Sequence, residues 1–326
     1  MRDNVHKMKV SNTYHVGCST DDNYIHHAAV MVCSLLENNR DNDIVIHLLY
    51  ESLEATNRQL LENLVQRYGA GIVFHKVDVS VLEGVKYRKV RPLSAAAYYR
   101  LLLSSVLPDI DKVLYLDVDT AVLGDISPLF ALDMDSYALA AVKDVVPCFD
   151  DHRMSLSLPY DEDYFCSAVM LINLKYWREH EAQPRLIEFA KRDRVVFCHD
   201  QDALNYVFKG QWYQLPPKWN RFNMNYIPAS AFRDYRDRYE YNHEPVIIHF
   251  SDYKPALRPF CVKYAGVYRT YLELSGCKLP ACEKASFGKR LGPIRTYVFR
   301  TFLKRLGLYD SYLYLRLYLR KKLGRV

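Results

Sequence analysis

The sequence lacks the features that mark secreted and membrane-spanning proteins. Its 326 residues hold eight scattered cysteines with no Cys-x-x-Cys pair, and no apolar run approaches the roughly 20 residues needed to cross a bilayer. The N-terminus is polar and has no secretory signal pattern, and we find no internal repeat or low-complexity segment. These absences indicate reduced thiols and a cytoplasmic location, with membrane contact limited to the inner surface of the cell membrane.

Acidic residues are scarce only at the end of the chain. Residues 284–326 hold twelve Lys and Arg against one acid, Asp310, so the first 283 residues carry a net charge of −5 although the whole chain carries +6. The basic charge therefore belongs to the tail. A uniformly basic nucleic-acid-binding protein is not indicated, and we expect no nucleic-acid partner.

The tail has the pattern of a membrane-surface helix. Its apolar residues recur every four positions beside basic residues, at Ile294, Val298, Phe302 and Leu306. This pattern predicts that residues 284–326 bind an anionic membrane surface, while a C-terminal helix packed on the body is the alternative. Residues 312–319 alternate with a period of two, which leaves their conformation open. We therefore divide the chain into a globular domain of residues 1–275 and a basic, aromatic segment of residues 276–326, which we expect to associate with the membrane.

Alternating strand and helix patterns fill the first part of the chain. Strands are expected at residues 13–18, 43–50, 71–77 and 112–120, and helices at 23–38, 52–68 and 94–106. This alternation predicts an α/β fold with a mostly parallel central sheet flanked by helices. Beyond residue 125 the pattern is less regular, with strands near 137–143 and 168–173, one helix at 177–194 and a shorter helix at 200–208.

Two carboxylates follow the apolar run Val113-Leu114-Tyr115-Leu116. Because side chains alternate along a strand, Asp117 and Asp119 are expected on one side of it, where they can share a divalent cation. The alternative is that both are ordinary turn residues. The buried character of the run favours a site, because open α/β sheets bind ligands at the carboxyl ends of their strands.

Two other polar clusters have helix capping as a competing explanation. The segment from Asp21 to Tyr24, with Asn23, follows the first strand and offers carboxylate, amide and aromatic groups to a nucleotide. Asp200 and Gln201 stand at the start of a helix.

Three cationic or titratable side chains have the chemistry of a phosphate or metal site. His249 ends an apolar strand and Lys254 follows it, although both also fit a strand end at the surface. Arg100 lies in an otherwise apolar helix, so it needs a buried anionic partner or must extend to water.

Taken in order, these residues resemble glycosyltransferase family 8, most closely the bacterial branch that builds lipopolysaccharide, lipooligosaccharide and capsule chains from UDP-sugars. The resemblance covers about residues 12–270. It implies a GT-A type nucleotide-sugar-binding fold and a retaining, metal-dependent hexosyltransferase. UDP-glucose or UDP-galactose would be the donor, and a glycan, expected to be lipid-linked, would accept the hexose in an α-linkage.

The resemblance also assigns roles to individual residues. The implied nucleotide and diphosphate contacts are Asp21, Asn23, Tyr24, Arg100, Val118 and Lys254; the metal ligands are Asp117, Asp119 and His249; and the residues at the transferred sugar are Asp144, Asp200 and Gln201. Two departures from the family pattern stand out. Cys166 occupies a position where the family usually has a sugar-contacting Asn, and Lys254 comes one residue early, so that Arg258 is a second candidate for the phosphate.

The implied ligand set favours Mn²⁺ over Mg²⁺, although carboxylates accept either ion. The ion would stabilise charge on the departing UDP as a Lewis acid, and the acceptor hydroxyl would attack from the same face with a phosphate oxygen taking its proton. No side chain stands out as a covalent nucleophile. A nucleotide-sugar hydrolase is one alternative, and a non-catalytic nucleotide- or carbohydrate-binding protein is another.

Overall fold

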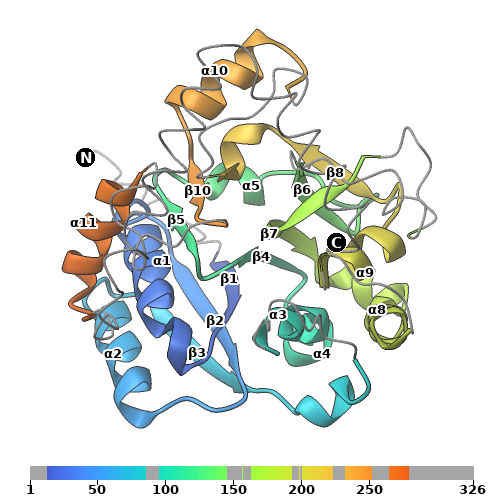
Figure 1. Ribbon diagram of the computed structural model, residues 1–326, viewed down its shortest axis with the longest axis horizontal. Helices are drawn as coiled ribbons and strands as arrows, with labels where there is room; N and C mark the ends of the chain where they lie inside the picture. The colour runs from blue at the N-terminus through green and yellow to red at the C-terminus, as the bar shows by residue number, and fades with distance from the viewer. Residues whose placement is uncertain are drawn as a thin grey trace, which may run out of the picture.

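The protein is described from a computed structural model. The structure describes residues 13–85, 95–144, 156, 163–192, 198, 200–222, 232–251 and 264–278. Within these residues a seven-stranded sheet lies between two layers of helices, and a second sheet of three strands lies beside it (Figure 1).

The first half of the chain builds the parallel part of the large sheet. Strands β1 (Tyr14–Ser19), β2 (Ile44–Tyr50), β3 (Gly71–Lys76) and β4 (Lys112–Leu116) stand in the order β3-β2-β1-β4, and every neighbouring pair is parallel. Helices cover both faces of the sheet, which suits the almost wholly apolar sequences of β2 and β4.

The second half adds strands β6 (Leu139–Lys143), β7 (Phe165–Asn173) and β8 (Trp212–Leu215), in the order β4-β7-β6-β8. β7 is antiparallel to both of its neighbours, whereas β6 and β8 are parallel. The prediction of an α/β fold with a mostly parallel sheet is therefore confirmed.

The strand predicted at residues 112–120 is instead two strands in two sheets. β4 ends at Leu116, and β5 (Thr120–Val122) belongs to the small sheet with β10 (Ile247–His249) and β9 (Arg221–Phe222). Between them the chain turns, with the Thr120 N–H and hydroxyl donating to the Asp117 carbonyl at 3.1 and 2.7 Å. Asp117 and Asp119 thus lie in a turn, and the prediction that strand alternation aligns them was wrong.

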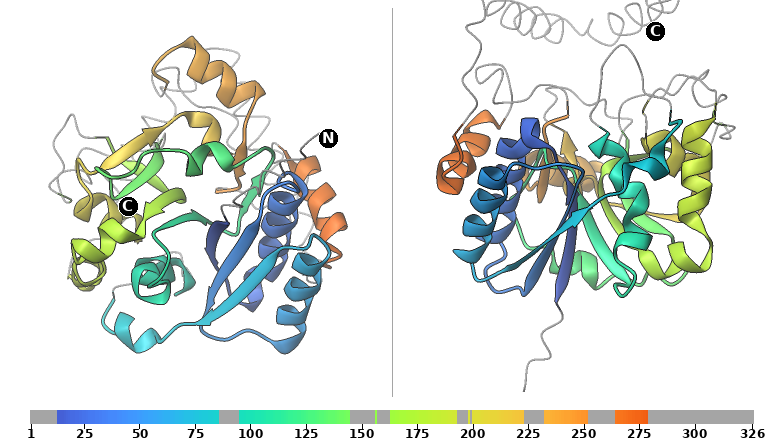
Figure 2. Two further views of the ribbon diagram at one scale, coloured as in Figure 1. Left: turned by 180° about the vertical axis from the view of Figure 1, so that it is seen from behind. Right: turned by 90° about the horizontal axis from the view of Figure 1, so that it is seen from below.

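Two groups of helices cover opposite faces of the large sheet (Figure 2, right). On one face lie α1 (Ile25–Glu37), α2 (Ala55–Gln66) and α11 (Ala265–Ser275). On the other lie α3 (Ala96–Tyr99), η3 (Arg100–Leu102), α4 (Leu103–Val106), α7 (Leu174–Glu179), α8 (Ala182–Lys191) and α9 (Asp200–Val207). The other helices among the described residues are η1 (Asp22–Tyr24), η2 (Val79–Leu82), α5 (Ser127–Phe130), η4 (Pro217–Trp219) and α10 (Tyr235–His243).

The single helix predicted at residues 177–194 is also wrong. Glu181 has a left-handed backbone with φ of 49°, which ends α7 and allows α8 to begin in a new direction. The apolar pattern of the sequence continues on both sides of Glu181, so the sequence alone does not reveal the break between the two helices.

Two other expectations concern thiols and the membrane. The described cysteines, Cys18, Cys33, Cys166, Cys198 and Cys277, are all free, as expected for reduced thiols. Among the described helices, none has the length and hydropathy of a membrane span. Lys254, Arg258 and the whole basic segment 284–326 lie outside the described residues.

Three histidines form a ladder across β1, β2 and β3. His15 Nδ1 lies 3.0 Å from His47 Nε2, and His47 Nδ1 lies 3.0 Å from His75 Nε2. Burial, together with the charges of His15 and His75, lowers the pKa of His47 to about 4. Burial also lowers the pKa of His15, against the opposing effect of Asp43, and that of His75. The ladder is therefore neutral near pH 7.

Because of this histidine ladder, we expect the protein to be less stable in mild acid. An unfolded histidine takes up its proton near pH 6.5, so between pH 6.5 and 4 the unfolded chain binds more protons than the folded chain. The stabilisation is complete above pH 6.5 and is lost as the pH falls toward 4. We expect His47, whose side chain is buried, to contribute on the order of 1–2 kcal/mol to the loss between pH 7.5 and 5.

Urea unfolding of wild type and His47→Gln at both pH values measures this contribution, because glutamine cannot titrate. The exposed His243→Gln variant should keep the wild-type pH dependence. An unchanged pH dependence in His47→Gln would assign the acid loss to other groups.

Candidate active site

Several strand ends meet at one edge of the large sheet. β1, β4 and β6 run in the same direction, so the residues after them, including Asp117 and Asp144, lie at this edge. The antiparallel β7 begins there, and it brings Cys166 and Ser167 to the same place. The topology therefore gathers polar side chains from distant parts of the sequence at the edge where open α/β sheets bind ligands.

Asp117, Asp119 and His249 form one group. Each side chain offers a ligand atom, and the three atoms lie within 4.8 Å of one another. Antiparallel pairing of β10 with β5 sets His249 opposite Thr120, and the Phe250 N–H donates to the Asp119 carbonyl at 2.9 Å. Two carboxylates and one imidazole are a suitable donor set for Mn²⁺ or a similar divalent ion. The residues present thus fit the metal that the sequence implied.

The surroundings of His249 affect its charge. Its Nε2 atom lies 3.5 Å from Asp119 Oδ1, and its Nδ1 atom lies 4.0 Å from the sulfur of Cys166. Burial alone would lower the pKa of His249, but contact with Cys166 and the charges of Asp117 and Asp144 raise it. A negative site of this kind favours a bound cation.

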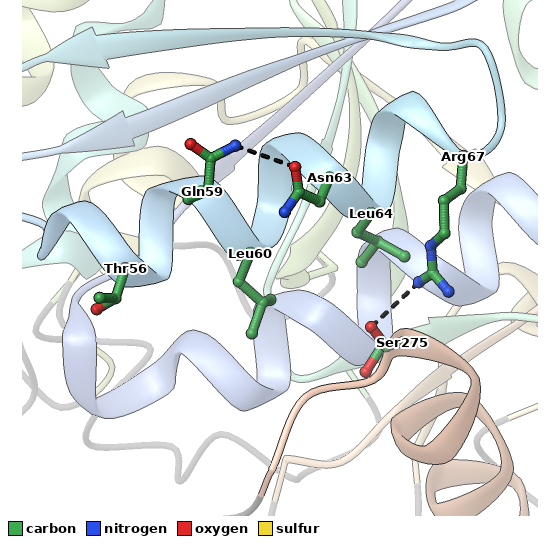
Figure 3. A pocket seen from close by; sticks show the side chains of 7 residues that line it. All are labelled: Thr56, Gln59, Leu60, Asn63, Leu64, Arg67 and Ser275. Carbon is green, nitrogen blue, oxygen red and sulfur yellow. Dashed lines mark hydrogen bonds between the residues drawn. The ribbon is translucent and has the colours of Figure 1, made fainter.

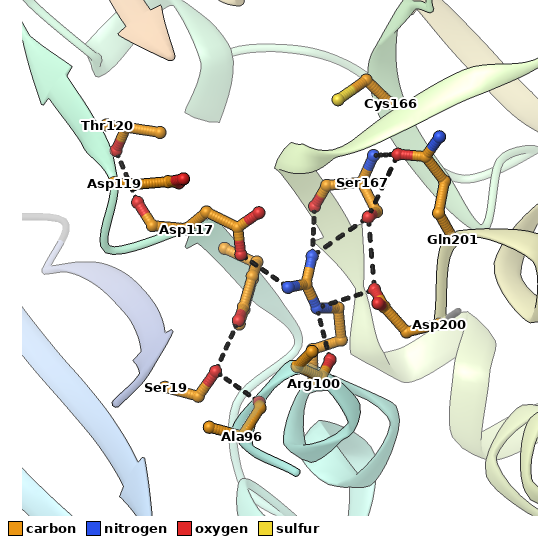
Figure 4. A network of polar contacts seen from close by, with 12 residues as sticks. Ser19, Ala96, Arg100, Asp117, Asp119, Thr120, Cys166, Ser167, Asp200 and Gln201 are labelled. Atoms are coloured by element: carbon orange, nitrogen blue, oxygen red, sulfur yellow. Dashed lines mark hydrogen bonds and ion pairs between the residues drawn. The ribbon is translucent and has the colours of Figure 1, made fainter. Parts of the chain in front are cut away.

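Arg100 connects the metal group to α9 (Figure 4). Its side chain is buried and donates to Asp117 Oδ1 at 2.5 Å, while Nε lies 3.1 Å from Asp200 Oδ2. Further bonds run to the Ala97 carbonyl at 3.0 Å and to the Ser167 carbonyl at 2.7 Å. Of the two alternatives that the sequence left open for Arg100, a buried anionic partner or extension to water, the first is confirmed, with Asp117 and Asp200 as partners.

The pKa shifts of Arg100 and Asp200 follow from burial and from the charges of neighbouring groups. Burial works against the charge of Arg100, but Asp117 and Asp200 outweigh it and raise the pKa of the guanidinium. Burial raises the pKa of Asp200 to about 6, with Arg100 opposing the shift and Asp117 adding to it. Arg100 makes its shorter contact with Asp117, at 2.5 Å, and at Asp200 the effect of burial outweighs the attraction of Arg100.

Gln201 has a fixed side-chain amide. Its Oε1 accepts from the Ser167 N–H at 2.9 Å, and its Nε2 donates to Asp144 Oδ2 at 2.9 Å. Because one partner is a donor and the other an acceptor, these contacts decide which way the amide points. Asp144, Asp200 and Gln201 thus join one network with Arg100 and Ser167.

The segment after β1 lies at the same edge but is not part of this network. Asp21 Oδ1 accepts from the Tyr24 N–H at 3.1 Å and caps η1, as the capping alternative predicted. Asp22 accepts from the Glu54 N–H and the Asn57 amide. Within the described residues, neither Asn23 nor Tyr24 forms a hydrogen bond or ion pair with the Asp117 group. The half-buried Tyr24 ring lies beside His27 with centroids 5.4 Å apart.

Sequence reasoning missed three supporting residues. The Tyr115 ring lies beneath Arg100, 4.5 Å from the guanidinium carbon, and its hydroxyl bonds Ser19 at 2.7 Å. Ser167 contacts Arg100, Asp200 and Gln201. Val118, which the family resemblance named as a nucleotide contact, packs into the core on the α1 side. No local sequence pattern predicts the roles of Ser167 and Tyr115, because these roles depend on β7 lying beside β4.

A second hollow lies away from this site, between α2 and α11 (Figure 3). Arg67 bridges the two helices by donating to the Leu274 and Ser275 carbonyls at 3.1 Å each. None of the residues that the sequence predicted for the site lines this groove.

The sequence model for "Glycosyl transferase family 8" matches residues 15–257. The chain belongs to glycosyltransferase family 8. Members of this family are retaining, metal-dependent hexosyltransferases that use a nucleotide-sugar donor and a glycan acceptor, typically with a divalent ion and a UDP-sugar. The recognition of the family from its ordered motifs is therefore confirmed.

Family 8 relatives cover most of the chain. General stress protein A of Bacillus subtilis (strain 168) is 29% identical over 252 residues, covering 74% of this chain and 87% of the relative. A lipopolysaccharide 1,2-glucosyltransferase of Escherichia coli is 28% identical over 253 residues, covering 75% and 73%. The solved galactosyltransferase LgtC, in complex with donor and acceptor sugar analogs, is 29% identical with a TM-score of 0.71, covering 84% of this chain and 99% of that structure. The match to LgtC supports the GT-A type fold.

Proposed function

We propose that this family 8 enzyme transfers glucose or galactose from its UDP-sugar to a lipopolysaccharide-core, lipooligosaccharide or capsular glycan and forms an α-linkage. The observation that carries the proposal is the grouping of Asp117, Asp119 and His249 within 4.8 Å beside the Arg100 network. The similarity to an E. coli glucosyltransferase and to the galactosyltransferase LgtC supports a hexose as the transferred group.

In this proposal the residues of the chain divide the work. Asp117, Asp119 and His249 hold Mn²⁺, which when bound supplies Lewis-acid stabilisation of the charge that develops on the diphosphate. Arg100 fixes the direction of the Asp117 carboxylate, and Lys254 adds positive charge toward the phosphates. Asp21, Asn23, Tyr24 and Val118 bind the nucleotide.

The sugar lies over the network formed by Asp144, Asp200 and Gln201. The Gln201 amide is held from both ends, so its position is set before substrate binds and little reorganisation is needed. The acceptor hydroxyl attacks the anomeric carbon on the face that UDP leaves, and a phosphate oxygen takes its proton. This course retains the α configuration without a covalent nucleophile from the protein.

Product analysis tests the proposal. The full chain is incubated with Mn²⁺, a panel of UDP-sugars and cell-envelope glycan acceptors, and the products are weighed by mass spectrometry. We expect the acceptor to gain one hexose with UDP-glucose or UDP-galactose, and UDP release to require the acceptor. Rapid UDP release without any gain in acceptor mass would instead identify a nucleotide-sugar hydrolase.

Two substitutions should separate nucleotide binding from turnover. Tyr24→Ala removes the ring proposed to stack on uracil and should weaken UDP binding about tenfold, as base stacking contributes roughly 1–3 kcal/mol. Gln201→Ala should lower kcat by tenfold or more and leave UDP affinity within about twofold. Calorimetric titration with UDP and Mn²⁺, together with steady-state kinetics, measures both effects.

Tyr24→Phe keeps the ring and serves as the matched control for Tyr24→Ala, so it should bind UDP as the wild type does. Equal losses of UDP affinity in Tyr24→Ala and Gln201→Ala would remove this division of roles.

The domain division belongs to the same proposal. Residues 1–275 form the catalytic domain, and the basic segment 276–326 holds the enzyme on the cytoplasmic face of the membrane, beside a lipid-linked acceptor. Each Lys or Arg near an anionic surface contributes roughly 1 kcal/mol, and salt weakens the attraction. Twelve such residues lie in 284–326.

Deletion of residues 284–326 should therefore abolish sedimentation with anionic liposomes and preserve transfer to a soluble acceptor sugar. Neutral phosphatidylcholine liposomes are the control and should bind neither form. Liposome binding that survives the deletion would disprove the membrane role, and a truncated chain that does not fold would favour a helix packed on the body.

A further inference from the structure

His249 is held at both ring nitrogens. Nε2 lies 3.5 Å from Asp119 Oδ1, and Nδ1 lies 4.0 Å from the Cys166 sulfur. Both Cys166 and His249 are more than nine-tenths buried. The sulfur lies within hydrogen-bonding range for a sulfur atom, and it is the partner that the structure gives to Nδ1.

Alternation along β7 explains why Cys166 can reach this ring. Ser167 contacts Arg100 and Asp200, so its neighbour Cys166 projects to the other side of the strand. In Figure 4 the Cys166 side chain takes no part in the bonds that join Arg100, Ser167 and Gln201. The Cys166 thiol therefore contacts His249, and the Ser167 side chain contacts Arg100.

The two contacts favour different protonation patterns of the imidazole. A neutral histidine binds a metal through a nitrogen that carries no proton, so the proton must sit on the other nitrogen. Asp119 alone would favour a proton on Nε2, which would block that nitrogen as a ligand. A hydrogen-bond acceptor at Nδ1 favours the opposite tautomer and leaves the Nε2 lone pair directed at the carboxylates.

We propose that Cys166 is a positioning residue, whose sulfur accepts the Nδ1–H of His249 and keeps Nε2 available to the divalent cation. This inference rests on the metal role of His249 in the proposed function. Cys166 then contributes to cation affinity through His249 and need not touch the sugar.

Mn²⁺ affinity of the full chain tests this role directly. Free Mn²⁺ is measured by electron paramagnetic resonance in the presence of UDP, for wild type, Cys166→Ala and Cys166→Ser. Partners of metal-ligating histidines typically change affinity 10–100-fold. We expect about tenfold weaker binding in Cys166→Ala and a smaller loss in Cys166→Ser, whose hydroxyl can still accept a hydrogen bond. Cys277 is also buried and lies near α11, and the control variant Cys277→Ala should bind Mn²⁺ as the wild type does.

Nitrogen-15 NMR of histidine-labelled, metal-free protein with UDP supplies a second readout. In the wild type His249 should carry its proton on Nδ1, and in Cys166→Ala the signal should move toward a mixture of tautomers. Cys166→Ala that binds Mn²⁺ within twofold of wild type, with the tautomer unchanged, overturns the role of Cys166 alone. A wild type that binds no Mn²⁺ overturns the proposed metal site itself.

Discussion

Asp119→Ala is expected to lower hexose transfer at least a hundredfold while the protein stays folded. Removing one of two carboxylates uncouples the cation from the diphosphate. Loss of an oriented Lewis acid costs several kcal/mol of transition-state stabilisation, and each ~1.4 kcal/mol is a tenfold change in rate. Steady-state assays at saturating UDP-sugar measure the loss, and a thermal unfolding midpoint close to wild type shows that the fold survives.

The matched control for this change is Asp135→Ala, because Asp135 is an exposed carboxylate whose side chain has no part in the Asp117 group. It should turn over at the wild-type rate. Near-wild-type activity in Asp119→Ala that EDTA still abolishes would place the ion elsewhere in the protein.

Among the predicted substitutions, Arg100→Met should cause the largest decrease in the free energy of unfolding. The substitution leaves Asp117 and Asp200 near each other without the cation that joins them, and breaking a buried ion pair by removing one partner typically costs about 3–5 kcal/mol. Transfer should fall strongly as well, because Asp117 loses the contact that orients it. Urea unfolding at pH 7.5 measures the change in free energy of unfolding.

The difference in free energy of unfolding between wild type and Arg100→Met should be smaller at pH 5 than at pH 7.5. Asp200 has a pKa already raised to about 6 by burial, and removal of Arg100 raises it further, so protonation at pH 5 relieves the unpaired charge. Arg185→Met is the control, since Arg185 donates only to a backbone carbonyl at 3.3 Å, and it should cost less than about 1 kcal/mol. A similarly small cost for Arg100→Met at both pH values would show that the pairing does not stabilise the protein.

Much of the architecture followed from local patterns. The apolar runs at residues 43–50 and 112–116 favoured buried strands, and the helical patterns between strands favoured parallel pairing. The turn at residues 117–119 did not follow, because Asp-Val-Asp alternates as a strand does. Its conformation depends on β5 leaving the large sheet to pair with β10, more than 120 residues later in the chain.

The site was predictable in its ligands and not in its supports. Chemistry and family resemblance named Asp117, Asp119 and His249, and the lone charge in an apolar helix required an anion near Arg100. Which anions Arg100 contacts depends on the position of α9 across β7. The contact between Cys166 and His249 also joins segments 83 residues apart, so no sequence spacing could reveal it.

The central claim is that Asp117, Asp119 and His249 hold the catalytic cation beside the UDP-sugar. Anomalous diffraction from crystals of the full chain grown with Mn²⁺ and UDP tests it most directly. The account predicts one strong manganese peak within bonding distance of all three side chains and of the diphosphate. A manganese peak at other residues, with the diphosphate distant from Asp117 and Asp119, would contradict it.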